Sequence, residues 1–239
     1  MKILKGQGSF EIYETPEELR VQLLKIERVG RTCYQSEREP ITMETAIKFS
    51  RMLASRHHYS LWNFGFMTVK FVHCSRGFTH ELVRHRLAAY AQESTRYVDY
   101  SGGDEPDLKH FELKCIVPPH HDENEKITLD DGRIMTCLEM LGETERFYRG
   151  LRSAGWLPDA ARQLLPTAIK ADIWIETNFT EWRHIFEMRT QLAAHWEIRA
   201  VMCALLEAVQ KIIPVIFDDF VLAGTDKNGL RYYELAKQS

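Results

Sequence analysis

The chain has 239 residues, of which 44% are apolar, enough to bury the core of one large globular domain or two small ones. It carries 31 lysines and arginines against 34 aspartates and glutamates, which gives a formal net charge of −3. This balance excludes a whole-protein attraction to nucleic acid or to an anionic membrane. Any cluster of positive charge must therefore have a local role.

The apolar stretches are cut by charges well short of the roughly 20 residues that a membrane-spanning helix needs. The first residues lead into a polar segment and do not resemble a signal peptide. We therefore expect a soluble, intracellular and cytoplasmic protein. The five cysteines are scattered without a C-x-x-C pair, so we expect reduced thiols that mostly pack in the interior, and no metal site is predicted.

The first third of the chain predicts two helices and a strand. The stretch TPEE at residues 15–18 is a helix start, with a capping hydroxyl, proline at the first helical position and acids in the first turn. Gly30 is expected to end this helix. A second helix is predicted from Thr42 to about Arg56, and residues 64–74, rich in β-branched and aromatic side chains, predict a strand. Helical spacing then returns near Thr79, on the segment that includes Leu82, Val83 and Leu87.

The rest of the chain predicts more helix than strand. The expected elements, in order, are a polar loop at 101–113, a strand at 114–117, a helix from about Gly132 to Ala154, a short helix at 159–165 and a strand at 169–177. Asn178 opens another helix, with Glu181 in capping-box spacing. The last long helix runs from about Ala193 to Ile213, before Pro214.

The predicted strands are few and do not repeat. This pattern favours an α+β fold with a small, mostly antiparallel sheet and several long helices. We expect residues 1–239 to form a single domain. The sequence has no G-x-G-x-x-G motif after a strand, no P-loop and no G-x-S-x-G elbow, so a bound nucleotide must be held in some other way.

Three charged residues, Arg84, His85 and Arg86, stand side by side. On a helix, successive side chains lie about 100° apart, so the two arginines would point to nearly opposite sides. They would then serve two ligand groups or two subunits. The alternative is a solvated basic turn without a ligand.

Further arginines stand next to apolar or hydroxyl-bearing residues. Ser94 and Arg96 lie on the same side of an extended chain, and a hydroxyl beside a guanidinium suits a phosphate monoester. Arg189 occupies the next position on a helical stripe of apolar residues, and Arg162 stands just before Pro166. Each alone is also typical of an ordinary surface arginine. Together they indicate a polyanionic ligand held by side chains.

A signature and four further segments resemble one protein family. RHRLAAYAQES, at residues 84–94, fits the R-H-R, seven residues, then serine signature of the flavin-dependent thymidylate synthases, the ThyX family. HHYSLWNF at 57–64, SRGFTHELVRHR at 75–86, AARQLLP at 160–166 and the block at 177–199 are similar to the family's other segments. The resemblance spans roughly residues 30–217.

The resemblance implies a fold, an activity and an assembly. Members are homotetrameric FAD-dependent methyltransferases with FAD where several subunits meet. They convert dUMP to dTMP, taking the carbon from methylenetetrahydrofolate and reducing equivalents from NADPH through FAD. A related flavoenzyme that methylates or hydroxymethylates uracil C5 of another nucleotide is an alternative. A non-catalytic nucleic-acid-binding protein is another, against which the negative net charge counts.

The resemblance also implies roles for individual residues. Ser94 and Arg189 would be catalytic, with Arg189 at the uracil, where charge develops, and Arg162 at the phosphate. The positions similar to dUMP contacts are Glu81, Arg84, Gln92, Glu93, Ser94, Thr95, Arg96, Arg162 and Arg189. The positions similar to FAD contacts are His58, Ser60, Asn63, Arg84, His85, Arg86, Gln92, Asn178 and His184.

The chain departs from the usual family pattern at several positions. Ala89 and Ala91 replace the serine and asparagine of the commonest signature, and Glu81 replaces a glutamine. Thr180 stands where many relatives have an arginine that contacts the flavin phosphate. This replacement is expected to weaken FAD binding unless Arg183 takes over that contact.

Overall fold

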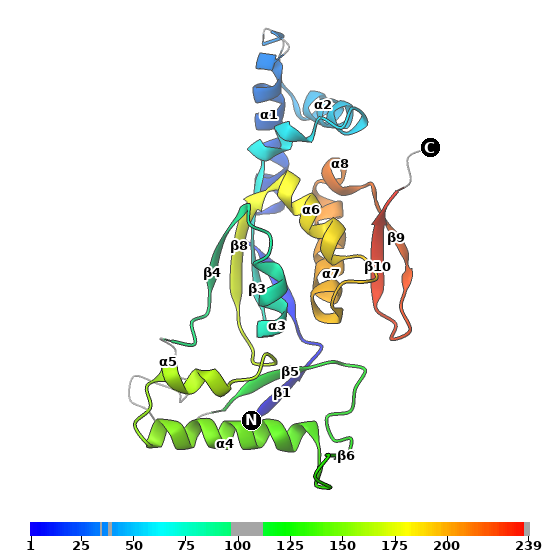
Figure 1. Cartoon of the computed structure of the whole chain (residues 1–239). Helices are drawn as coiled ribbons and strands as arrows, with labels where there is room; N and C mark the ends of the chain where they lie inside the picture. Colours follow the sequence, from blue (N-terminus) through cyan, green and yellow to red (C-terminus); the bar gives the residue numbers. More distant parts are fainter. Residues whose placement is uncertain (34, 38–39, 97–111, 237–239) are drawn as a thin grey trace. The chain divides into compact units, whose positions relative to one another are not determined.

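The protein is described by a computed structural model that covers residues 1–33, 35–37, 40–96 and 112–236 (Figure 1). Its contacts divide the chain into two compact units. The first unit comprises residues 1–9, 72–80 and 92–173, and the second unit comprises residues 10–71, 81–91 and 174–239. The predicted α+β class is confirmed, whereas the prediction of one domain is not tested by this division. None of the described helices combines the length and apolarity that crossing a bilayer requires.

The first unit contains a parallel strand pair, β1 (Lys2–Lys5) and β5 (Lys114–Val117), in which Ile3 lies opposite Cys115. The prediction for 114–117 is therefore confirmed. The unit's later helices are α4 (Cys137–Ser153), α5 (Pro158–Ala161) and the 3-10 helix η2 (Arg162–Leu164). Their shared core consists of Leu113, Cys115, Val117, Leu141, Tyr148, Ala161 and Ile169.

The start of α4 differs from the prediction. A short antiparallel hairpin, β6 (Ile127–Thr128) and β7 (Ile134–Met135), occupies the first residues of the expected helix. Gly132 lies in its turn with φ of +83°, a conformation that favours glycine. The helix begins after Thr136, whose hydroxyl accepts the Glu139 N–H at 3.1 Å while the Glu139 carboxylate accepts the Thr136 N–H at 2.8 Å. This capping box sets the helix start.

A four-stranded sheet lies at the centre of the second unit. Its strands, in spatial order, are β2 (Ser9–Ile12), β3 (Phe66–Val72), β8 (Ile173–Asn178) and β4 (Ala88–Gln92). Alternate residues of β3 are fully buried, as the period of a strand requires. The predicted strand at 169–177 begins only at Ile173, because Ile169 and Lys170 form isolated bridges instead of a ladder.

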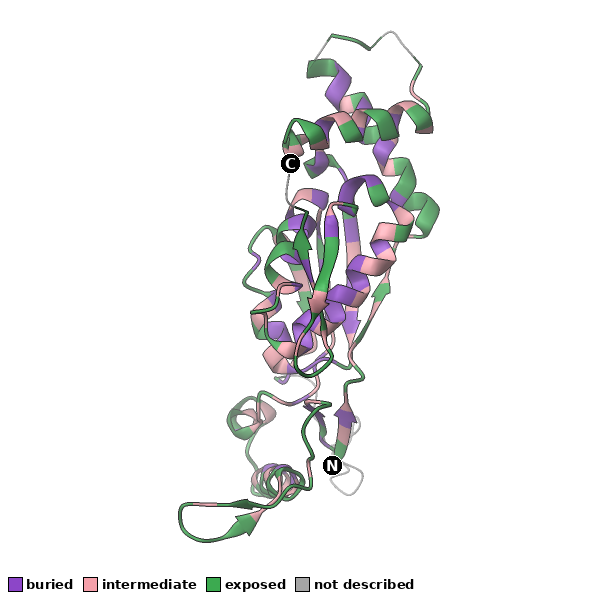
Figure 2. Ribbon diagram, turned by 90° about the vertical axis from the view of Figure 1, so that its right-hand side faces the viewer, coloured by how far each residue is buried: buried purple, intermediate pink, exposed green. Residues whose placement is uncertain are grey.

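Helices and a hairpin complete the second unit. They are α1 (Pro16–Cys33), α2 (Met43–Ser55), the 3-10 helix η1 (Tyr59–Phe64), α6 (Phe179–Arg189), α7 (Trp196–Ile212), α8 (Pro214–Phe217) and the antiparallel strands β9 (Phe220–Thr225) and β10 (Arg231–Leu235). Strand β10 packs on α7 (Figure 1). Buried residues follow the inner faces of the helices, as Figure 2 shows.

One helix runs across the division between the units. Helix α3 (Arg76–Leu82) belongs to the first unit up to His80 and to the second unit from Glu81. The apolar spacing predicted a helix through Leu87, but α3 ends at Leu82. Leu87 is 73% exposed, so it does not belong to a buried helical face. The loop expected at 101–113 lies, up to residue 111, outside the described residues.

The sequence suggested that Gly30 ends the first helix, but Gly30 lies inside it. The reason is close packing between α1 and α2, because a Cβ atom at Gly30 would lie 2.3 Å from Cζ of Phe49. The helix continues to Cys33. Gly30 is therefore required by tertiary packing and not by helix termination.

This packing gives a prediction for stability. Gly30→Ala should lower the free energy of unfolding by about 1–3 kcal/mol, the usual cost of overpacking. Gly150→Ala, in α4, is the matched control, because no atom lies within 4 Å of the added Cβ. It should raise stability by about 0.5–1 kcal/mol, the usual gain in a helix interior. Urea unfolding measures both, and a Gly30→Ala variant as stable as the wild type would contradict the packing.

Candidate functional site

The segment with the three neighbouring charges is not helical. Helix α3 ends at Leu82, β4 begins at Ala88, and Arg84, His85 and Arg86 lie in the turn and coil between them. The hydroxyl of Tyr90 lies 2.9 Å from the Leu82 carbonyl oxygen and 2.7 Å from that of His85. Burial, with a contribution from Glu181, raises the pKa of Tyr90 to about 12, so this hydroxyl stays protonated and donates. The prediction of opposed helical directions for the two arginines is wrong.

His85 is the buried member of this segment, with 5% of its surface exposed. Its Nε2 accepts a hydrogen bond from Nε of Arg189 at 3.0 Å. Burial lowers the pKa of His85 to about 4, and the charges of Arg189 and His184 act in the same direction. The imidazole is therefore neutral at physiological pH.

Arg189 is fixed by three contacts, all within the second unit. Besides His85, its guanidinium donates to the Glu81 carbonyl oxygen at 2.8 Å and forms an ion pair with the Glu81 carboxylate. Glu81 is one of the departures from the family pattern, and here it supplies a charge opposite to that of Arg189. Three of the predicted site residues, Glu81, His85 and Arg189, are thus brought together.

Arg84 and Arg86 differ from His85 in being exposed. Within the described ranges, neither guanidinium has an ion pair or hydrogen bond with the protein. Two unpaired guanidinium groups in one short segment suit an anionic ligand.

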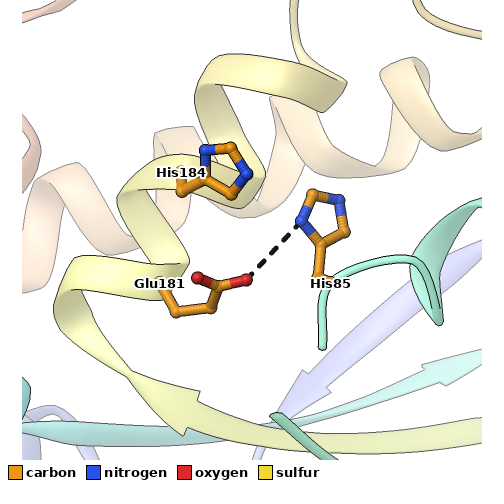
Figure 3. Close-up of side chains that lie close together, drawn as sticks. All are labelled: His85, Glu181 and His184. Carbon is orange, nitrogen blue, oxygen red and sulfur yellow. Dashed lines mark ion pairs between the residues drawn. The ribbon is translucent and has the colours of Figure 1, made fainter. Parts of the chain in front are cut away.

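A second neighbour of His85 comes from α6. Nδ1 of His85 lies 3.7 Å from Oε1 of Glu181, and His184 lies one turn further along the same helix (Figure 3). The His85 and His184 ring centroids are 5.5 Å apart. Burial raises the pKa of Glu181, although His184 acts to lower it. The sequence indicated Glu181 only as a capping residue, and its position beside His85 could not be read from the spacing.

Helix α6 begins as predicted at Asn178. The Asn178 side chain accepts the Glu181 N–H at 2.8 Å, so it caps the helix. Its side-chain oxygen is thus committed to the helix end. Its predicted flavin contact stays a prediction.

A pocket of about 810 Å³ lies in the second unit between α2, η1, α6 and α8. Tyr59, Trp62 and Phe220 give it aromatic walls, and His184 also lines it. The Trp62 side chain is buried, and its Nε1–H has no hydrogen-bond acceptor among the described residues. The predicted flavin residues His58, Ser60 and Asn63 lie at or next to η1, the element that carries Tyr59 and Trp62, and all three are exposed.

Arg183 does not replace the arginine that is missing at Thr180. Its guanidinium donates to the carbonyl oxygen of Ile216 at 2.6 Å and to both carboxylate oxygens of Asp219 at 2.6 and 2.5 Å. It also lies 5.1 Å from the ring centroids of Tyr59 and Phe220 and 5.3 Å from that of Trp62. The Thr180 hydroxyl donates to the Tyr59 carbonyl oxygen at 2.8 Å. Both side chains are thus engaged within the protein, and both also line the pocket.

The first unit holds the other predicted dUMP contacts. Strand β4 ends at Gln92, so Ser94 and Arg96 do not continue it. The Ser94 Oγ accepts the Arg96 N–H at 3.1 Å, which forms a local turn. The expectation of an extended Ser94–Arg96 pair is therefore wrong. Arg162, at the start of η2, donates to the buried Thr95 hydroxyl at 3.0 Å.

Gln92 and Glu93 are held by residues that the sequence did not single out. Gln92 donates to the Thr79 hydroxyl at 2.6 Å, and the Glu93 carboxylate pairs with Lys170 at 2.8 Å. Burial acts to lower the pKa of Lys170, but its bonds to Glu93 and Asp172 raise it overall. The sequence held no local signal for these partners, because residues 170–172 precede the strand and their contacts with Glu93 depend on the tertiary structure.

Known proteins resemble this chain over most of its length. A family model described as "Thymidylate synthase complementing protein" matches residues 21–215. The flavin-dependent thymidylate synthase of Geobacter sulfurreducens (strain ATCC 51573 / DSM 12127 / PCA) is 31% identical over 196 residues, covering 80% of this chain and 78% of that protein. That of Mycobacterium avium (strain 104) is 29% identical over 209 residues, covering 83% and 79% respectively.

A similar fold is found among solved structures. The crystal structure of a UMP/dUMP methylase, PolB from Streptomyces cacaoi, bound with 5-Br dUMP, superposes with a TM-score of 0.68 at 17% sequence identity. The match covers 91% of this chain and 96% of that one. At this identity the likeness concerns the fold alone. The family model and the relatives, which span most of the chain, show that it belongs to the family of flavin-dependent thymidylate synthases.

Proposed function

We propose that the protein is an FAD-dependent methyltransferase that converts dUMP to dTMP. The carbon comes from methylenetetrahydrofolate and the reducing equivalents from NADPH. The observation that carries the proposal is the R-H-R signature in a chain of this family, with its histidine bonded to Arg189 at 3.0 Å. We also propose that residues 1–239 act as one catalytic domain in the cytoplasm.

The residues of the second unit fit a flavin in two respects. The pocket beside η1 has the aromatic walls and the volume typical of a site for a planar ligand. Arg84 and Arg86 are cations without carboxylate partners among the described residues. When bound, FAD would carry the reducing equivalents of NADPH.

We propose that the flavin is held by residues of the second unit and by Gln92. These are His58, Ser60, Asn63, Arg84, His85, Arg86, Gln92, Asn178 and His184. The pocket is also lined by charged groups that largely pair with one another, Arg51 with Asp218 and Arg183 with Asp219. Together with its aromatic walls, this suits the uncharged ring system of the flavin. The exposed Arg84 and Arg86 suit the phosphates.

For dUMP we propose contacts of two kinds. Arg162 meets the phosphate, aided by Ser94, Thr95 and Arg96, because a guanidinium beside hydroxyl groups suits a monoester. Arg189 meets the uracil, where its fixed positive charge stabilises negative charge that develops on the ring. Glu81, Arg84, Gln92 and Glu93 complete the proposed contacts.

A second candidate keeps the flavin chemistry but changes the nucleotide. The structural relative PolB is described as a methylase of UMP as well as dUMP. A ribonucleotide substrate, or hydroxymethylation in place of methylation, is therefore the alternative. Mass analysis of the product separates these outcomes.

The function is tested by anaerobic turnover. The purified protein should be yellow, and its flavin absorbance should bleach when NADPH is added without oxygen. With dUMP and methylenetetrahydrofolate it should then form dTMP, identified by mass, and a parallel reaction with UMP tests the alternative. A colourless protein indifferent to added FAD would contradict both candidates.

Two substitutions test the proposed catalytic residues. Ser94→Ala and Arg189→Ala should each lower kcat/KM for dUMP, the latter by about 100-fold, the usual effect of removing one group that stabilises developing charge. Arg133→Ala is the control, because Arg133 is exposed on the β6–β7 hairpin. Wild-type turnover and dUMP affinity in either test variant would refute that residue's assignment.

We also propose that the protein is a homotetramer, as the family resemblance implies. Helix α4 exposes an apolar surface that includes Met140, 57% exposed, and Phe147, 61% exposed. These residues line a depression of about 620 Å³ with Leu151 and Leu164. A second copy of the chain is the occupant that the proposal assigns to this surface.

The assembly is tested by light scattering coupled to gel filtration. The wild type should have the mass of four chains, and Phe147→Lys should reduce it without changing the circular dichroism spectrum, because Phe147 packs little within its own chain. Gln163→Lys, at another exposed position, is the control. A monomeric wild type would contradict the tetramer.

A further inference from the structure

The hydrogen bond between Arg189 and His85 fixes where the imidazole carries its proton. A guanidinium has only donors, so Nε2 of His85 must be the nitrogen that accepts. His85 is neutral at physiological pH, because burial lowers its pKa to about 4. Its single ring proton therefore lies on Nδ1.

The nitrogen that carries this proton faces Glu181. Oε1 of Glu181 lies 3.7 Å from Nδ1, longer than a direct hydrogen bond but close enough for electrostatic attraction to the N–H group. Both side chains are shielded from solvent, since Glu181 is 8% and His85 5% exposed. An acceptor at this place favours the same tautomer that Arg189 requires.

The same geometry decides against a metal ion at this place. Ligand atoms of His85, Glu181 and His184 lie within 4.8 Å of one another, so a cation site is the obvious alternative. A histidine that binds a metal through one nitrogen donates a hydrogen bond from the other. Here the other nitrogen, Nε2, accepts a hydrogen bond, which leaves Nδ1 protonated and without a lone pair for the metal.

We propose that Glu181 is a positioning residue that holds His85 in the Nδ1-protonated tautomer, so that His85 keeps Arg189 oriented. The chain of contacts runs from Glu181 to His85 and then to Nε of Arg189. The other guanidinium nitrogens of Arg189 contact Glu81. The link to catalysis rests on the proposed role of Arg189 at the uracil. The tautomer itself does not depend on that role.

The tautomer is read directly by nitrogen NMR. In protein labelled with ¹⁵N-histidine at pH 7, we expect one ring with a protonated Nδ1 and an unprotonated Nε2, a signature absent from His85→Gln. Glu181→Leu removes the acceptor at similar volume. Without it the Nε2-protonated tautomer, which cannot accept from Arg189, becomes more populated, so the Nδ1 signal should shift toward the average of the two tautomers. Glu181→Gln keeps an oxygen acceptor and should preserve the wild-type signature.

Activity provides the second measurement. Glu181→Leu should lower kcat for dUMP about 10-fold, because His85 loses the neighbouring carboxylate that favours the tautomer to which Arg189 donates. Its flavin content should be unchanged, and Glu181→Gln should restore most of the activity. Glu44→Leu, on the exposed side of α2, is the control.

Three results would overturn the inference. The first is a wild-type His85 protonated on Nε2, and the second is a Glu181→Leu variant with unchanged nitrogen shifts and kcat. The third is a purified protein that retains a stoichiometric transition metal and loses it in His184→Ala. The NMR measurement needs no substrate. Absence of any nucleotide product from the wild type would therefore refute the proposed function but not the tautomer of His85.

Discussion

The hydrogen bond from Arg189 to His85, 3.0 Å long, is the interaction on which the proposed chemistry depends. It joins the R-H-R segment to the end of α6 across 104 residues of sequence. Because a guanidinium can only donate, this bond determines the state of the imidazole as well as its orientation. The carboxylate of Glu81 then holds the same guanidinium from α3. The guanidinium that we propose for the uracil is thus held by one neutral partner, His85, and one negative partner, Glu81.

The local fold explains how this bond arises. Helix α3 stops at Leu82, and the Tyr90 hydroxyl donates to the carbonyl oxygen of Leu82 and to that of His85, beyond the helix. The chain therefore turns, which buries His85 and leaves Arg84 and Arg86 exposed. A continued helix would have spaced these three side chains by about 100° each. The turn instead separates a buried positioning group from two exposed cations within three residues.

The sequence predicted those elements whose signals are local. The helix start at Thr42, the helix that Asn178 opens and the strand at 114–117 were correctly expected, because helix-start and β-branched residues act within a few positions. The apolar spacing through Leu87 was misleading, since Leu87 is exposed and Tyr90 ends the helix through a side-chain contact. Gly30 was misread because its neighbour Phe49 comes from another helix. The arginines were recognised one by one, but the pairing of Arg189 with His85 and Glu81 depends on tertiary structure, and their proposed roles came from the family resemblance.

A crystal structure of the protein with FAD and dUMP bound tests the central claim most directly. The account predicts that Nε of Arg189 still donates to Nε2 of His85 while the remaining guanidinium nitrogens contact the uracil. A complex in which Arg189 has left His85, or in which the uracil binds without touching Arg189, would contradict it.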